Sequence, residues 1–260
     1  MNMDLENFSL DFFNLNGKVA IVTGGNTGLG QGYAVALAKA GADLFIATYN
    51  DDWDETRALI EKTGRKVHFH QADLTDRQSL KGIVTACMDV YGKIDILVNN
   101  AGTIRRAPLL EYKAEDWDAV MDINLNAVYL LSQEVAKVMV EQKSGKIVNI
   151  CSMLSFQGGK FVPPYTASKH AVAGLTKAFA NELGQYNVQI NAIAPGYVAT
   201  ANTAPIRADE QRNAEILSRI PAGRWATPAD LMGVVVFLSS RASDYMNGHI
   251  LAIDGGWLAR

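Results

Sequence analysis

Short apolar runs alternate with longer segments of mixed polarity along most of the chain. Each run has the length of a strand, and these strands are apolar along most of their length. Such strands are typical of a parallel sheet that is covered by helices on both faces. The expected strands are Lys18–Thr23, Asp43–Thr48, Lys66–Gln71, Ile94–Asn99, Lys146–Cys151, Val188–Ala194 and Ile250–Ile253.

In the segments between these runs, apolar residues recur at helical spacing. Leu29, Tyr33 and Leu37 follow this spacing in the first segment, and Gly41 suits the position just past a helix end. The alternation therefore predicts an α/β fold. The expected helices are Gly28–Ala40, Trp53–Lys62, Leu80–Tyr91, Asp116–Val140, Tyr165–Leu183 and Glu210–Arg219.

The pattern is continuous, and no stretch rich in Gly, Pro or Ser divides the 260 residues. We therefore expect one domain over residues 1–260. The one long, weakly patterned stretch is 196–228, and long connections of this kind are often lids or binding loops. The alternative is a surface excursion that carries the helix at Glu210–Arg219.

Composition excludes several classes of protein. The chain is 48% hydrophobic and 20% charged, with a net charge of −3, and Arg105-Arg106 is its longest basic run. A nucleic-acid partner is therefore not expected. No apolar stretch is long enough to span a bilayer, and Met1–Asn16 has no signal-peptide pattern. With two cysteines, too few for a disulfide framework, the sequence predicts a cytoplasmic protein without membrane partners.

A glycine-rich turn joins the first expected strand to the first expected helix. Gly24, Gly28 and Gly30 allow a tight turn and a close approach of the backbone to a ligand. The free N–H groups at the helix start can bind a diphosphate. In this context, between a buried strand and a helix, the turn predicts dinucleotide binding.

The residues after the second strand bear on the choice of dinucleotide. Thr48-Tyr49-Asn50 precede Asp51 and Asp52, and no Lys or Arg stands there to pair with a 2′-phosphate. Two carboxylates would repel that phosphate, which favours NAD, with NADP not excluded. Alternatively, both aspartates merely begin a helix. Asp73 either contacts the adenine edge or caps the helix at Leu80–Tyr91.

Tyr165 and Lys169 are separated by one helical turn and share a helix face. A phenol has a pKa of about 10, too high for acid–base work near pH 7. An ammonium about 4 Å away is worth about 4 kcal/mol at an effective dielectric constant of about 20, or about three pKa units. The pair is thus expected to exchange a proton with an alcohol or ketone.

Other polar residues are expected at the same sheet edge. Ser152 closes the fifth expected strand, Lys146–Cys151, and could donate to the reacting oxygen. Asn124 lies within a long expected helix, where Asn is a mediocre helix former, and is expected to bond backbone or water. His68 and His70 share a strand face, but no third ligand is in register, so no metal site is expected.

Taken together, TGGNTGLG, the NNAG at 99–102, YTASK at 165–169 and PGYVAT at 195–200 resemble the short-chain dehydrogenase/reductase family over essentially all 260 residues. The resemblance implies a Rossmann-type, doubly wound sheet of about seven strands, a homotetramer, and NAD(P) as cofactor. It implies Tyr165 as acid/base, Lys169 lowering the pKa of Tyr165 and holding the ribose, Ser152 orienting the carbonyl, and Asn124 supporting a water relay. Thr48 departs from the acidic residue common in NAD-using members. The implied cofactor contacts are Gly24, Asn26, Thr27, Gly28, Leu29, Gly30, Thr48, Tyr49, Asp73, Leu74, Asn100, Ala101, Gly102, Tyr165, Lys169, Pro195, Gly196, Val198 and Thr200.

Finer motifs, among them CSMLSFQGG at 151–159 and the closing DGGWLAR, are similar to members of the family that act on six-carbon sugar acids. This implies hydride transfer at the 5-position of a 2-keto-3-deoxy sugar acid. Arg105 or Arg106 could clamp the carboxylate, while Gln157 and Asn202, with Ser152 and Tyr165, could meet hydroxyls. The alternatives are gluconate oxidised at C5, a 3-oxoacyl group on an acyl carrier, or a dinucleotide sensor without turnover.

Overall fold

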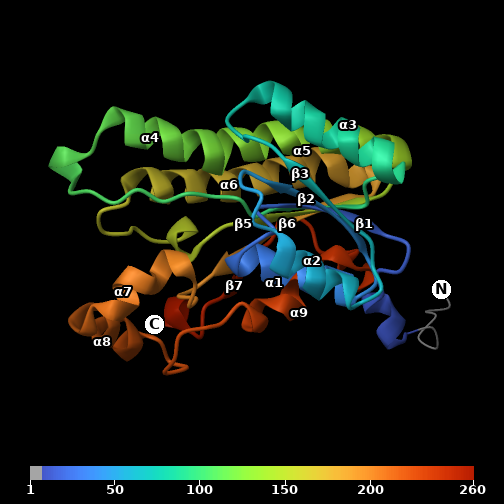
Figure 1. Cartoon of the computed structure of the whole chain (residues 1–260). Helices are drawn as coiled ribbons and strands as arrows, with labels where there is room; N and C mark the ends of the chain where they lie inside the picture. The colour runs from blue at the N-terminus through green and yellow to red at the C-terminus, as the bar shows by residue number, and fades with distance from the viewer. Residues whose placement is uncertain (1–7) are drawn as a thin grey trace.

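A single sheet of seven parallel strands forms the centre of the protein (Figure 1). The computed structural model describes residues 8–260. Part of Met1–Asn16, the segment in which no signal peptide is expected, therefore lies outside the described residues. The strand order is β3-β2-β1-β4-β5-β6-β7, which confirms the doubly wound, Rossmann-type prediction. The strands are β1 (Val19–Thr23), β2 (Asp43–Thr48), β3 (Val67–Gln71), β4 (Ile96–Asn99), β5 (Gly145–Ile150), β6 (Val188–Pro195) and β7 (Ile250–Ile253).

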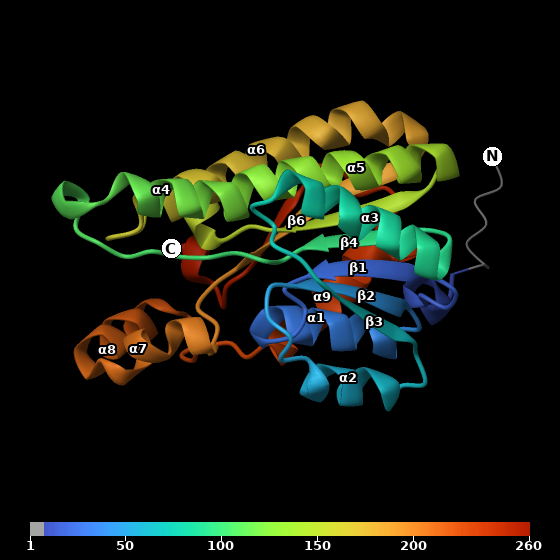
Figure 2. The same cartoon turned by 45° about the horizontal axis from the view of Figure 1, so that its top comes forward.

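Helices cover both faces of the sheet (Figure 2). One face carries α1 (Gly28–Lys39), α2 (Asp54–Glu61) and α9 (Ala229–Ser239). The other carries α3 (Arg77–Tyr91), α4 (Ala114–Met121), α5 (Ala127–Gln142) and α6 (Pro163–Leu183). The short helices α7 (Ala204–Ala208) and α8 (Glu210–Arg219) stand apart from both layers, within the segment 196–228 that was expected to form a lid.

The interior strand β1 shows why most of the runs are apolar along most of their length. Successive side chains of a strand point to opposite faces. In β1, Ala20 and Val22 pack into the core beneath α1 and α9, whereas Val19 and Ile21 pack into the core beneath α3 and α5. All four are at most 4% exposed. Burial on both faces therefore requires an apolar residue at each position.

Two helical regions differ from the sequence-based expectation. The helix expected at Asp116–Val140 consists of α4 and α5 joined by a π-helical turn, Asp122–Asn126, that holds Asn124. Helix α9 was not predicted, because its sequence ADLMGVVVFLS is apolar nearly all round and lacks an amphipathic period. Among residues 8–260, no helix combines the length and apolarity needed to cross a membrane.

The strand order also fixes where a ligand can bind. The chain moves outward from β1 to β3 and then returns to the other side of β1 to form β4. The loops that follow β1 and β4 therefore leave the sheet in opposite directions and open a crevice at the carboxyl ends of these strands. In open α/β sheets, ligands bind at this switch point.

Candidate active site

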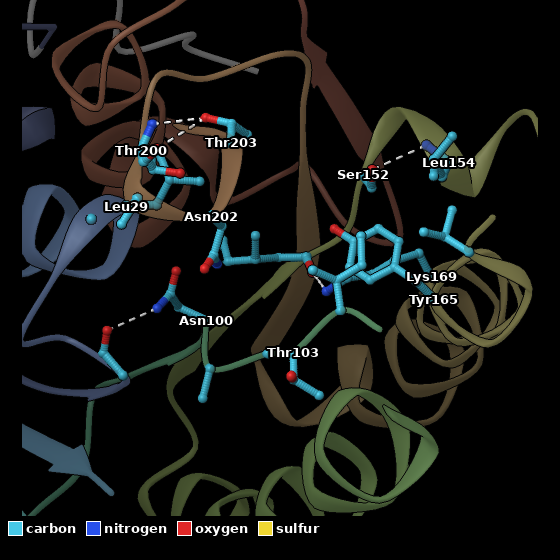
Figure 3. Close-up of a pocket in the computed structure, with 18 of the residues that line it drawn as sticks. Leu29, Asn100, Thr103, Ser152, Leu154, Tyr165, Lys169, Thr200, Asn202 and Thr203 are labelled. Atoms are coloured by element: carbon cyan, nitrogen blue, oxygen red, sulfur yellow. Dashed lines mark hydrogen bonds between the residues drawn. The ribbon is translucent and has the colours of Figure 1, made fainter. Parts of the chain in front are cut away.

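A cavity of about 1420 Å³ lies at the carboxyl ends of the strands. It extends from the glycine-rich turn after β1 to α8, and Figure 3 shows the part between Leu29 and Tyr165. Most of the residues singled out from the sequence line it. These are Gly24, Asn26, Thr27, Gly28, Leu29, Gly30, Tyr49, Asp73, Leu74, Asn100, Ala101, Gly102, Arg105, Arg106, Ser152, Gln157, Tyr165, Lys169, Gly196, Thr200 and Asn202.

The turn between β1 and α1 has the backbone that a diphosphate requires. Gly24 and Gly28 have φ of +61° and +57°, a region that favours glycine. A Cβ atom at Gly30 would collide with the Gly24 carbonyl. Thr27, which precedes α1, makes no capping hydrogen bond through its side chain, so the N–H groups of the first turn remain available to an anion. These residues fit a bound dinucleotide.

Asn100 holds this turn against the end of β4. Its Nδ2 donates to the carbonyls of Thr23 and Gly24, at 2.9 and 3.1 Å. In return, the Thr23 hydroxyl accepts hydrogen bonds from the N–H groups of Asn100 and Ala101, both at 3.0 Å. The two strand ends at the switch point are thus tied together, which fixes the floor of the cavity.

The cavity wall beside β2 and β3 is acidic. Asp52 and Asp73 line it, and no Lys or Arg from β2 or from the segment that follows it does. Asp52 accepts a hydrogen bond from Asn26 Nδ2 at 2.5 Å, so it does not merely begin α2. Asp73 accepts from the Thr75 N–H, and it is Asp76 that caps α3. The capping role considered for Asp73 is therefore wrong.

Tyr165, Lys169 and Ser152 meet at the opposite side of the cavity (Figure 3). Pro163 starts α6, which places Tyr165 in the first turn and Lys169 in the next. Ser152 follows β5, and its hydroxyl accepts from the Leu154 N–H at 3.1 Å. Lys169 Nζ donates to the Ile150 carbonyl at 2.6 Å, so the ammonium is anchored at the end of β5.

The electrostatics of the pair differ from the sequence-based expectation. Burial raises the pKa of Tyr165, and hydrogen bonding with Ser152 and the charge of Arg106 oppose this effect. Burial also lowers the pKa of Lys169. Lys169 Nζ lies 5.6 Å from the centre of the Tyr165 ring. In the protein alone, desolvation thus outweighs the attraction that was expected to make the phenol acidic.

Four of the predicted residues do not line the cavity. Asn124 is fully buried, accepts from the Thr103 N–H at 2.8 Å and donates to the Thr103 carbonyl at 2.9 Å. It bonds backbone, as expected, and holds the loop after β4. Thr48 is buried, and its hydroxyl donates to the Asn50 carbonyl. Pro195 is buried at the end of β6. Val198 is buried and pairs with Ala226 in an isolated β-bridge. If these residues affect a ligand, they do so through their neighbours.

The two arginines after β4 have different surroundings. Arg105 Nε lies 3.6 Å from a carboxylate oxygen of Asp116, and both side chains are exposed. Arg106 forms no ion pair with any residue in the range 8–260 and acts electrostatically on Tyr165. Of the two, Arg106 is therefore the one available to a ligand. His170 is exposed and outside the cavity, and the described residues contain no cluster suited to a metal ion.

Sequence reasoning missed the wall formed by α8 and the C-terminal segment. Arg212, Glu215, Arg219 and Trp257 line the cavity there. The three α8 residues recur at spacings of three and four and therefore share one helix face. That spacing was visible in the sequence, but the side of the molecule on which α8 would lie was not.

Comparison with known proteins identifies the family. The model of the short chain dehydrogenase family matches residues 18–211. The chain is 53% identical over 250 residues to the 2-dehydro-3-deoxy-D-gluconate 5-dehydrogenase of Bacillus subtilis, covering 96% of this chain and 98% of the relative. It is 44% identical to the gluconate 5-dehydrogenase of Gluconobacter oxydans, with 95% and 96% covered.

A solved structure agrees with these matches. The crystal structure of a gluconate 5-dehydrogenase from Burkholderia cenocepacia, in complex with NADP and tartrate, superposes with a TM-score of 0.93 at 36% identity, covering 97% of this chain and 100% of that chain. The protein is an NAD(P)-dependent oxidoreductase that acts on CH–OH groups. With the fold, the cavity and these matches in agreement, the chain belongs to the short-chain dehydrogenase family.

Proposed function

We propose that this enzyme transfers a hydride between NAD(H) and the 5-position of a 2-keto-3-deoxy sugar acid. The observation that carries the proposal is one continuous cavity. At one side it has a glycine-rich turn suited to a dinucleotide, at the other it has arginines suited to a carboxylate, and Ser152, Tyr165 and Lys169 also line it. A sugar acid presents the two groups that this arrangement would recognise, an anion and a reactive CH–OH.

In this proposal Tyr165 exchanges the proton of the substrate hydroxyl. The bound nicotinamide dinucleotide supplies or accepts the hydride. Ser152 hydrogen-bonds the reacting oxygen, and the same hydroxyl favours the ionised form of Tyr165. Lys169, anchored on the Ile150 carbonyl, holds the ribose. Its ammonium stabilises the ionised phenol more strongly once a ligand excludes water from the site. Asn124 positions the loop after β4 through Thr103.

Replacement of the phenol tests the reaction. We expect Tyr165→Phe to lower turnover more than about 100-fold, because general acid–base groups contribute at least that much. Its binding of NADH should stay close to that of the wild type, since the ring is retained. Turnover of the variant near the wild-type level would show that another group moves the proton.

The sequence relatives support the choice of substrate. Proteins named for action on 2-dehydro-3-deoxy-D-gluconate and on gluconate are among those most similar to this chain. Consumption of NADH should be measured against 2-keto-3-deoxy sugar acids with a 5-keto group, against 5-ketogluconate, and against acetoacetyl thioesters. The first group should give the highest kcat/KM. Arg106→Ala should raise KM for the sugar acids, because Arg106 lines the cavity and forms no ion pair with the part of the chain that the structure describes.

We propose NAD(H) in preference to NADP(H) as the coenzyme. Asp52 and Asp73 form an acidic wall where the adenosine ribose would lie, with no cation from the β2 segment to meet a 2′-phosphate. The Burkholderia enzyme was solved with NADP, so the preference of this chain has to be measured directly.

We further propose a homotetramer working in the cytoplasm. Trp117 on α4 and Tyr129 on α5 are 41% and 39% exposed, and exposed rings on these two helices suit an interface between subunits. Cys87 and Cys151 are both buried and unpaired, as expected of a protein in a reducing compartment. Light scattering should give a mass of four chains.

A further inference from the structure

The part of the cavity beyond Tyr165 is strongly cationic. Its lining includes the cations Arg105, Arg106, Lys160, Arg212 and Arg219. The carboxylate of Glu215, on α8, lines the cavity beside them. Two of the arginines are compensated: Arg212 pairs with Glu215 at 2.8 Å, and Arg105 lies near Asp116.

The other two arginines have no such compensation. Arg106 and Arg219 form no ion pair with any residue that the structure describes. They come from different parts of the cavity lining: Arg106 from the loop after β4, and Arg219 from the last turn of α8. Two uncompensated guanidinium groups that line one cavity favour the binding of an anion there.

Arg219 is held in place by aromatic side chains. Its guanidinium carbon lies 3.9 Å from the centre of the Trp257 ring, a stacked arrangement that fixes the plane of the donor groups. Trp257 is 4% exposed and packs edge-on against Tyr197, with ring centres 4.9 Å apart. Tyr197 in turn packs against Trp225, which donates to Asn213 of α8. The guanidinium is therefore already oriented before a ligand enters.

Tyr197 also lines the cavity, within electrostatic reach of arginines from both parts of the lining. Burial raises the pKa of this tyrosine, while the charges of Arg212, Arg219 and Arg106 act to lower it. Arginines from both parts of the lining are thus close enough to act on one phenol. An anion in the same region would experience their combined field.

We propose that Arg219, stacked on Trp257, binds the carboxylate of the substrate together with Arg106, and so selects short polyhydroxy acids over neutral polyols and ketoses. The inference rests on the proposed function, because it takes a sugar acid as the substrate. A planar fork of N–H donors matches a carboxylate in a two-point contact, which favours this anion over a neutral hydroxyl. Arg219 lies on the segment 196–228, so the same contact would draw that segment toward the substrate.

The test is binding to the complex of the enzyme with NADH. D-Gluconate and D-glucitol differ at C1, a carboxylate in one and a CH₂OH in the other, and neither can accept a hydride. We expect wild-type enzyme to bind gluconate more tightly than glucitol. Arg219→Gln should weaken gluconate binding about tenfold or more, the scale of a lost charged hydrogen bond, with glucitol unaffected. Calorimetry or NADH fluorescence would measure both ligands.

A matched control comes from another stacked arginine. Arg241 lies over the Phe12 ring at 4.6 Å and does not line the cavity, so Arg241→Gln should leave both affinities unchanged. Arg219→Lys keeps the charge without the planar fork and should recover part of the gluconate affinity. Thermal unfolding of each variant shows whether the fold is retained.

Several outcomes would overturn the inference. One is equal affinity of the wild type for gluconate and glucitol. Another is an unchanged gluconate affinity in Arg219→Gln. A third is inorganic phosphate that displaces bound gluconate at a lower concentration than other sugar acids do. Failure of the proposed function is distinct. Gluconate held through Arg219 by an enzyme that reduces no keto sugar acid would support the anion site and refute the reaction.

Discussion

Tyr165 depends on its neighbours for a usable pKa. Burial raises that pKa, and the Ser152 hydroxyl opposes the rise by hydrogen bonding to the ionised phenol. Without this hydroxyl, the phenol should ionise at a higher pH. We therefore expect Ser152→Ala to move the limb of the pH profile that reports Tyr165 ionisation, measured as kcat/KM for alcohol oxidation, toward higher pH. Turnover should also fall about 100-fold, as for the loss of an oxyanion-type donor.

A hydroxyl next to Tyr165 on α6 provides the control. Thr166 follows Tyr165 in the chain, yet its Oγ1 is buried with no hydrogen-bond partner among residues 8–260, and it does not line the cavity. Thr166→Val should leave the pH profile in place, and it should not lower stability because no hydrogen bond is lost. A profile that shifts equally in both variants would contradict the role given to Ser152.

Single residues also show how far sequence reasoning reached. Tyr165, Lys169 and Ser152 were recognisable because their types and spacing carry the chemistry. The direction of the Tyr165 pKa was not, because it depends on burial, which spacing does not reveal. Arg219 was missed for a related reason: its partner Trp257 is distant in the sequence, and an arginine in an exposed helix looks like an ordinary surface charge.

Elements were predictable where an apolar period identified them. The strands were found almost to the residue, and so was α8. The π turn at Asp122–Asn126 was not predictable, because it forms where the Asn124 side chain bonds to the backbone of a distant loop. Helix α9 was missed because it is buried between neighbours and apolar on most sides.

The segment 196–228 is joined to α9 by an ion pair. Arg224 donates to both carboxylate oxygens of Asp230, at 2.9 and 2.6 Å, and Asp230 also accepts from the Thr227 N–H. These contacts lower the pKa of Asp230 below its usual value. The stabilisation is therefore complete above the unfolded-state pKa of about 3.9, and it is lost as the pH falls through the lower value of the folded protein.

This ion pair leads to a prediction about the segment it anchors. Asp230→Asn should increase proteolytic cleavage within residues 200–228 at pH 7, while the melting temperature falls by at most about 2 °C, because exposed pairs contribute little. The difference from wild type should shrink as the pH falls below about 4. Glu134→Gln, which breaks the exposed pair with Lys137 on α5, should not change cleavage of this segment. Equal cleavage in all three proteins would argue against the anchor.

The distribution of charge across the whole molecule matters more than its sum. The net charge of −3 gives no hint that the cavity is acidic beside β2 and cationic beside α8. The strand order produces this division, because it brings the segment after β2 and the segment after β6 to the same edge of the sheet from opposite sides of β1. A dinucleotide and an acid would thus be sorted to separate ends of one cavity.

The acidic end makes a prediction about coenzyme choice. Asp52 lines the cavity, whereas the adjacent Asp51 does not. Asp52→Asn retains an acceptor for Asn26 but removes the charge that would repel a 2′-phosphate. We expect its kcat/KM with NADPH, relative to NADH, to rise about five- to tenfold, the scale of about 1 kcal/mol for two charges 4 Å apart in water. Asp51→Asn should leave the ratio unchanged. A wild-type enzyme that already prefers NADPH, or equal effects of the two substitutions, would show that the acidic wall does not select the coenzyme.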